Sequence, residues 1–207
     1  MQLEFFPIPF LCGLGMQCIM LVILRRRKQS YPFLFFFSVF WVYLLVLVGM
    51  VLFPIPLIDP ADADLWRSPA WFIFEKINLI PFDYVRYVNV PRMYLFLRDV
   101  VANILLTMPF GFGISFIIQV RARRVPALAI LAGVGIESSQ LIADLILGMS
   151  YRSVDINDSI MNAIGVMLGY VIFRFFAWCY LRIMEKYIPE RHGLWAYIYQ
   201  ICSQAAG

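Results

Sequence analysis

Five long apolar runs constrain how this chain of 207 residues folds more than any other feature. A helix needs about 20 mostly apolar residues to cross the hydrocarbon core of a bilayer. Runs of about this length lie at residues 8–24, 31–53, 100–120, 126–147 and 160–180. Because lipid cannot satisfy backbone hydrogen bonds, each run is expected to form a helix. The sequence therefore predicts an all-α, polytopic membrane helix bundle of about five transmembrane helices, forming a single membrane domain over residues 1–207.

Charged residues are scarce and unevenly placed along the chain. They make up 14% of the sequence, against about 25% in soluble domains. Basic clusters follow the first, third and fifth runs, at residues 25–28, 121–124 and 182–191. Since Lys and Arg in short loops favour the cytoplasm, we expect the N-terminus outside and the C-terminus in the cytoplasm. These clusters and Arg174 are expected to contact membrane lipids, and nucleic acid is not expected as a partner.

The long segment between the second and third runs is expected on the outer side. Residues 70–74 and 77–82 are apolar and aromatic, but Glu75, Lys76 and Pro81 interrupt them. Such a stretch is too short to span a bilayer. Irregular backbone at membrane depth survives only when protein covers it or when it lines a wet cavity. The segment is therefore expected to be either interfacial or re-entrant.

Polar residues gather on and between the last two runs, although charge is costly there. A charged side chain at the centre of a spanning helix costs about 2.5–3.5 kcal/mol on insertion scales. Residues three and four apart lie on one face of a helix. Two polar faces follow from this spacing, and they comprise Glu137, Gln140 and Asp144 on the fourth run and Asp155, Asp158 and Asn162 at the fifth. Ionisable groups in this position indicate a functional site.

Four segments in register resemble a known family. They are Asn-Leu-Ile-Pro-Phe at 78–82, Asn-Ile-Leu-Leu-Thr-Met-Pro-Phe-Gly-Phe at 103–112, Glu137-x-x-Gln140, and Arg-x-x-Asp-x-x-Asp-x-x-x-Asn-x-x-Gly-x-x-x-Gly at 152–169. Over residues 78–169 the chain resembles the VanZ-like family of bacterial membrane proteins. The resemblance implies a multi-pass protein of the bacterial plasma membrane. It also implies a role at the cell envelope in low-level resistance to teicoplanin, a lipid-tailed glycopeptide antibiotic. It implies no particular reaction.

With this topology the polar residues would line a funnel that opens to the outer leaflet. We expect the funnel to bind a lipid-like or phosphate-bearing amphiphile, because the planar Arg side chain makes paired hydrogen bonds to phosphate. Asp155 and Asp158 are candidate ligands for Mg²⁺ or Ca²⁺, and Glu137 is a candidate general base. The candidate binding residues are Asn78, Arg98, Asn103, Glu137, Gln140, Arg152, Asp155, Asp158 and Asn162.

Other functions remain compatible with these residues. The chain could be a membrane-embedded enzyme acting on a lipid-linked cell-wall precursor, or a small ion-coupled transporter that uses intramembrane carboxylates. It could also be an interaction protein that engages a partner or a lipid-tailed glycopeptide through the aromatic segment 66–82. A fourth possibility is purely structural, with Arg152, Asp155 and Asp158 forming an ion-pair network between the last two spans. The single histidine, His192, lies in the tail. Its position there excludes histidine-based zinc sites and Ser-His-Asp chemistry at the polar cluster.

Overall fold

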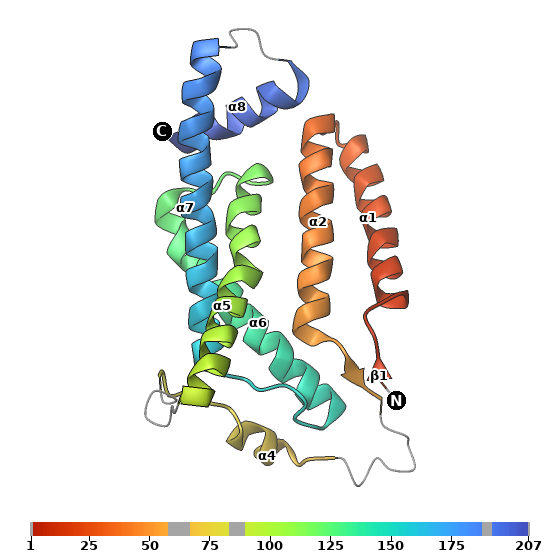
Figure 1. Cartoon of the computed structure of the whole chain (residues 1–207). Coiled ribbons are helices and arrows are strands. Elements are labelled where there is room, and N and C mark those ends of the chain that lie inside the picture. The colour runs from red at the N-terminus through yellow and green to blue at the C-terminus, as the bar shows by residue number, and fades with distance from the viewer. Residues whose placement is uncertain (1, 58–66, 83–89, 188–191, 207) are drawn as a thin grey trace.

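The computed structural model describes residues 2–57, 67–82, 90–187 and 192–206. Within them, five helices are long and apolar enough to cross a membrane, which confirms the expected helical membrane bundle. These helices are α1 (Ile8–Arg26), α2 (Tyr31–Leu52), α5 (Val90–Gly113), α6 (Val125–Leu147) and α7 (Ile156–Tyr187). In Figure 1, α1 and α2 form an antiparallel pair beside α5 and α7, and α6 runs obliquely across them.

The N-terminal segment is tied to the end of α2 by a short ladder. Strand β1 (Gln2–Leu3) pairs antiparallel with β2 (Ile55–Pro56), so that Leu3 lies opposite Ile55. These two-residue strands are the sheet structure that the described residues contain. They close one end of the α1–α2 pair, at the lower end of Figure 1.

Helix α7 forms the centre of the fold because it packs against α5, α6 and α8. Glycines allow the close approach. A Cβ atom on Gly165 would collide with the Ile104 carbonyl of α5, and one on Gly169 would collide with the Met108 carbonyl. On α6, a Cβ atom on Gly133 would meet the Ser159 carbonyl of α7. Small residues that let helix backbones approach are typical of membrane interfaces, and here they fix α7 against both neighbours.

The third span differs from its predicted bounds. Helix α5 begins at Val90 and ends at Gly113, and the 3-10 turn η3 (Ile114–Phe116) follows it. The span was expected over about 100–120, whereas residues 117–120 are not helical. The apolar run extends to Val120. Phe116, at the end of the 3-10 turn, stacks on Phe36, and its carbonyl accepts a hydrogen bond from the Tyr197 hydroxyl. Tertiary packing therefore ends this helix before the apolar run ends.

Two short helices lie at opposite ends of the bundle. Helix α4 (Ala70–Glu75) lies across the lower end of Figure 1 and does not insert between the spans. Its Ile73 side chain is buried, whereas Trp71 and Phe74 are exposed, as expected for an interfacial element. Trp66, the first residue of the aromatic segment, lies outside the described residues.

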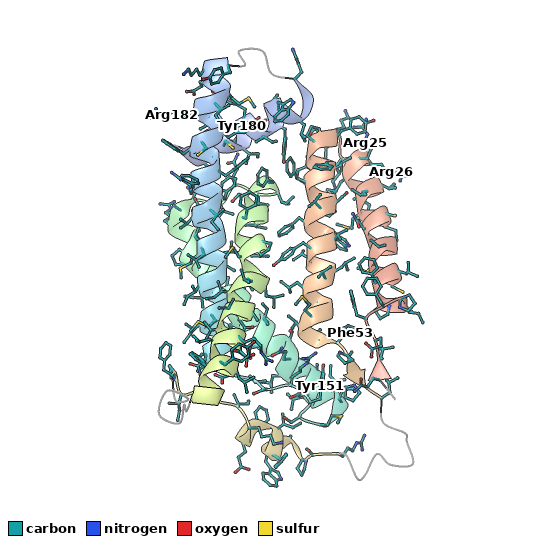
Figure 2. The ribbon with its side chains drawn as sticks, in the orientation of Figure 1. Arg25, Arg26, Phe53, Tyr151, Tyr180 and Arg182 are labelled. Carbon is teal, nitrogen blue, oxygen red and sulfur yellow. The ribbon has the colours of Figure 1, made fainter. Side chains whose placement is uncertain are left out.

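Helix α8 (Gly193–Ala206) packs against α7 at the upper end of Figure 1. Figure 2 shows Arg25, Arg26 and Arg182 at this same end, whereas Phe53 and Tyr151 lie at the other. The basic residues that follow the first and fifth spans therefore share one end of the bundle. The polar residues described below belong to the opposite end.

Candidate functional site

Asp155 caps the start of α7. Its Oδ1 atom accepts hydrogen bonds from the backbone N–H of Asn157 at 2.8 Å and from the Asn157 side chain at 2.7 Å. An aspartate in this position satisfies one of the free N–H groups of the first helical turn. Asp158 follows in that turn, where the helix dipole favours a negative charge. Local sequence thus explains why the fifth helix begins at Ile156.

Asn78 brings the segment before α5 to the same point. Its backbone N–H donates to the Val154 carbonyl at 3.0 Å, and its carbonyl accepts from the Ile156 N–H at 2.9 Å. Its side-chain amide donates to Asp155 Oδ2 at 3.1 Å. Nearby, the Phe82 N–H donates to Asn157 Oδ1 at 2.7 Å. Residues 78–82 are therefore attached to the start of α7 through main chain and side chains.

Glu137 reaches this point from α6. Its side chain is 6% exposed, and its Oε2 atom accepts from the Asp155 N–H at 3.0 Å. Three parts of the chain therefore converge on Asp155: the segment carrying Asn78, α6 and the start of α7. The Glu137 carboxylate contacts the main chain of Asp155 and not its side chain. This contact therefore positions Asp155.

A second group of polar residues joins α5 to α7. The Asn103 side chain donates to Asp158 Oδ1 at 2.7 Å. One turn further along, the Thr107 hydroxyl lies within hydrogen-bond distance of the Asn162 carbonyl at 2.8 Å and of the Asn103 carbonyl at 3.0 Å. The Asn162 side chain is 1% exposed, and both its Oδ1 and Nδ2 atoms lack a hydrogen-bond partner among the described residues. Leaving a buried polar group unpaired costs about 1–3 kcal/mol, so this amide needs an explanation.

A third group ties the turn after α6 to the end of α2. Gln140 Nε2 donates to the Val51 carbonyl at 3.2 Å, the Tyr151 hydroxyl donates to the Leu52 carbonyl at 3.1 Å, and Arg152 Nη2 donates to the Phe53 carbonyl. Figure 2 places Tyr151 and Phe53 at the same end of the bundle. Burial raises the pKa of the Tyr151 phenol, which keeps the group protonated as a donor.

Asp144 shapes that turn from the end of α6. Its buried carboxylate accepts from the N–H groups of Tyr151 at 3.3 Å and Arg152 at 3.2 Å. Gly148, with a positive φ of 66°, ends α6 in the left-handed conformation that glycine adopts at little cost. The Gly148 turn and the Asp144 contacts together place the Arg152 side chain against the end of α2.

Charge pairing plays a small part in this arrangement. Arg98 and Asp99, both exposed, form the one ion pair among the described residues, with Nη2 2.9 Å from Oδ1. The Arg98 guanidinium therefore pairs with its sequence neighbour Asp99. The structural alternative of an ion-pair network between Arg152, Asp155 and Asp158 does not form in the described part of the chain. Neutral amides and backbone groups satisfy these carboxylates instead.

The candidate cation ligands Asp155 and Asp158 already accept hydrogen bonds. In the ranges that the structure describes, no group of three or more His, Cys, Asp or Glu residues converges in a way that could hold a metal ion. Both oxygens of Asp155 already accept hydrogen bonds, and Asn103 already donates to Asp158. The contacts that cap α7 use Asp155 Oδ1, whereas Oδ2 accepts from Asn78, so Asp155 and Asp158 stay candidate ligands for Mg²⁺ or Ca²⁺.

An apolar pocket adjoins the polar cluster. It has a volume of about 290 Å³ and lies between α2, α5 and α6. Thr107 and Val51 belong to both features: they line the pocket, Thr107 contacts Asn162, and the Val51 carbonyl accepts from Gln140. The other lining residues are Leu44, Leu47, Val48, Leu52, Phe110, Leu131, Ala132, Gly135, Ile136 and Ser139.

The comparison with protein families matches this part of the fold. The model of the VanZ/LLP1 family matches residues 40–177. The chain belongs to the VanZ/LLP1 family. The match begins within α2 and ends within α7, so it extends beyond the segment 78–169 that carries the resemblance and includes all three walls of the apolar pocket. No curated protein and no solved structure matches the chain.

Several residues of this VanZ/LLP1 site were not identified from the sequence. Asn157 contacts both Asp155 and Phe82, and its position between Asp155 and Asp158 was the available signal. Thr107 lies one turn after Asn103 within the segment 103–112, but a threonine in an apolar run gives little indication of a shared hydrogen bond. Tyr151 could not be found from spacing, because its partner Leu52 lies 99 positions away.

Proposed function

We propose that this VanZ/LLP1 protein binds a lipid-tailed amphiphile from the outer leaflet and thereby contributes to low-level tolerance of teicoplanin and related lipoglycopeptides. The observation that carries the proposal is the junction between the apolar pocket and the polar cluster at Thr107 and Val51. A site for an amphiphile needs an apolar cavity for the tail beside polar groups for the head. The family's association with teicoplanin, itself a lipid-tailed molecule, supports the choice of ligand class.

The tail would occupy the pocket between α2, α5 and α6. Its volume of about 290 Å³ is at the small end of ligand sites and suits part of an acyl chain. Its walls are aliphatic and aromatic apart from Thr107 and Ser139. Gly135 opens the wall formed by α6, because a Cβ atom there would meet nothing within 4 Å.

The head group would use polar atoms that the protein leaves unpaired. Arg152 Nε is buried without a hydrogen-bond partner within the described ranges, and the Arg152 guanidinium already donates to the Phe53 carbonyl, two residues beyond the pocket residue Val51. Arg is suited to carboxylate or phosphate because its N–H groups form a planar fork. The Asn162 amide offers a further donor and acceptor. The outer-leaflet position is part of the proposal and is supported by the basic residues at the opposite end (Figure 2), since such residues favour the cytoplasm.

The test fills the pocket without touching the polar residues. Gly135→Leu places a side chain in the pocket. Gly15→Leu is the matched control, since Gly15 lies on α1 and a Cβ atom there would also meet nothing within 4 Å. Each variant would be expressed in a bacterial host, with its membrane abundance quantified and teicoplanin tolerance scored. Photolabelling by a phospholipid with a diazirine in its acyl chain would report occupancy of the pocket.

We expect Gly135→Leu to keep normal abundance but to lose both photolabelling near residues 131–136 and tolerance, whereas Gly15→Leu behaves like wild type. Arg152→Gln should weaken tolerance as well, because it removes the charge expected to hold the head group. If Gly135→Leu retains tolerance at wild-type abundance, the pocket does not carry the function. If photolabelling persists in that variant, the acyl chain binds elsewhere.

A further inference from the structure

A second cavity lies beside the connection between α5 and α6. Its volume is about 380 Å³, and it is bounded by the turn η3, the connection from η3 to α6, the middle of α7 and the end of α8. Phe173 and Ile201 contribute apolar side chains to the lining. Gln119 Nε2 donates to Gln204 Oε1 at 2.6 Å, which joins the α5–α6 connection to α8 across the cavity lining.

The charge of this lining is entirely positive. Arg121, Arg123 and Arg174 line the cavity, and no Asp or Glu is among the lining residues. The three arginines take part in no ion pair within the described ranges. Their fork-shaped donors are the side chains best suited to phosphate oxygens. Three such groups from two separate elements line one cavity, which favours a multivalent anion.

Ser115 supplies an independent observation from inside the same cavity. Its side chain is 5% exposed, and its hydroxyl is buried with no hydrogen-bond partner in the part of the chain that the structure describes, although Ser115 is among the residues that line the cavity. A buried hydroxyl without a partner is unfavourable. The hydroxyl would be satisfied if a ligand oxygen accepted its hydrogen bond. The cavity lining thus combines three exposed arginine side chains with one buried hydroxyl donor, that of Ser115.

We propose that this cavity binds a phosphate group, with Ser115 as the buried donor and Arg121, Arg123 and Arg174 as the charge partners. An anionic phospholipid of the adjacent leaflet and free phosphate from the aqueous phase share this chemistry. The apolar lining next to the arginines suits the glycerol and first acyl carbons of a lipid. The site is separate from the outer amphiphile site, because the two cavities have no lining residue in common.

The test compares ligands on the full-length protein in detergent. Native mass spectrometry would measure the binding of phosphatidylglycerol against phosphatidylcholine, and inorganic phosphate would be added as a competitor. We expect Ser115→Ala to weaken phosphatidylglycerol binding about three- to tenfold, since it removes one hydrogen bond. Because it also removes an unpaired buried hydroxyl, the melting temperature without ligand should stay the same or rise. Arg174→Gln should weaken binding about tenfold or more through loss of a charged donor.

Arg124→Gln is the matched control, because Arg124 belongs to the same basic segment but does not line the cavity. It should bind phosphatidylglycerol as wild type does. Selective phosphatidylglycerol binding that phosphate competes for only weakly identifies the lipid as the source. If inorganic phosphate instead displaces phosphatidylglycerol fully, the result supports the phosphate site and identifies the aqueous ion as its ligand. The proposal is overturned if Ser115→Ala binds like wild type, or if Arg124→Gln weakens binding as much as Arg174→Gln does.

Discussion

The side-chain amide of Asn78 donates to Asp155 Oδ2 at 3.1 Å, and the two residues also form a parallel β-bridge. They lie 77 positions apart in the chain. The other oxygen of the same carboxylate caps α7 through Asn157. One aspartate therefore fixes the start of the central helix and holds the segment after α4 against it.

Asn78→Ala should loosen that segment. The change removes the donor to Asp155 Oδ2, and a lost hydrogen bond to a charged group costs about 1.5–3 kcal/mol. We expect faster hydrogen exchange at residues 78–82 and at the first turn of α7, with a lower melting temperature. Leu79→Ala is the control, because Leu79 is exposed and its exchange should stay near wild type. Equal exchange in the two variants would show that the backbone bridge alone holds the segment.

Gly133→Ala and Gly135→Ala should differ although both lie on α6. A Cβ atom at Gly133 would collide with the Ser159 carbonyl of α7, whereas one at Gly135 would point into open space. We expect Gly133→Ala to lose about 1–3 kcal/mol by forcing the helices apart. Gly135→Ala should be neutral or stabilising by up to about 1 kcal/mol through helix propensity. Thermal unfolding in detergent measures both. A tolerated Gly133→Ala would contradict the close approach of α6 and α7.

Asn162→Leu should separate stability from function. The substitution removes an amide whose two polar atoms have no partner among residues that the structure describes, and relief of that penalty is worth about 1–3 kcal/mol. We therefore expect an unchanged or higher melting temperature together with reduced teicoplanin tolerance, measured at matched membrane abundance. Asn103→Leu serves as the contrast, because it leaves Asp158 without its donor and should lower stability. A destabilised Asn162→Leu would show that the amide is satisfied in the folded protein.

Cys202 should resist alkylation until the pH is high. Its side chain is 0% exposed, and burial raises the pKa of its thiol to about 11. Because the thiolate is the reactive form, only about 0.1% of the thiol reacts as thiolate at pH 8, and the rate should rise about tenfold per pH unit up to pH 11. The assay is maleimide labelling with the other three cysteines replaced by alanine. Moving the thiol to the exposed neighbouring position, as Cys202→Ser with Ser203→Cys, should give rapid labelling at pH 8.

The orientation in the membrane is tested with an impermeant maleimide on intact cells. In a background without other cysteines, Glu75→Cys on α4 should be labelled directly, and Ser203→Cys on α8 only after permeabilisation. Both positions are exposed and lie at opposite ends of the bundle. The reverse result would place the polar cluster at the cytoplasmic leaflet. It would contradict the proposed uptake of an amphiphile from the outer leaflet.

Much of the candidate site follows from helical spacing. Glu137 and Gln140 share a face of α6, and Asp155, Asp158 and Asn162 share a face of α7, as residues three and four apart must. The structure keeps these residues at one end of the bundle but assigns them separate partners. Asp155 contacts Asn78 and Glu137, Asp158 contacts Asn103, and Gln140 contacts α2. Arg98, which lies on α5 five positions before Asn103, pairs with Asp99 instead.

The sequence by itself determined the class of protein, the number of spanning helices and the family, because these depend on the length and spacing of apolar and polar residues within local windows. Only the tertiary structure decided the end of α5 at Gly113, the pairing of Asn78 with Asp155, and the two cavities. Each of these depends on contacts between segments far apart in the chain. The unpaired hydroxyl of Ser115 and amide of Asn162 belong to the same class, because local sequence does not state which neighbours a buried polar group will have.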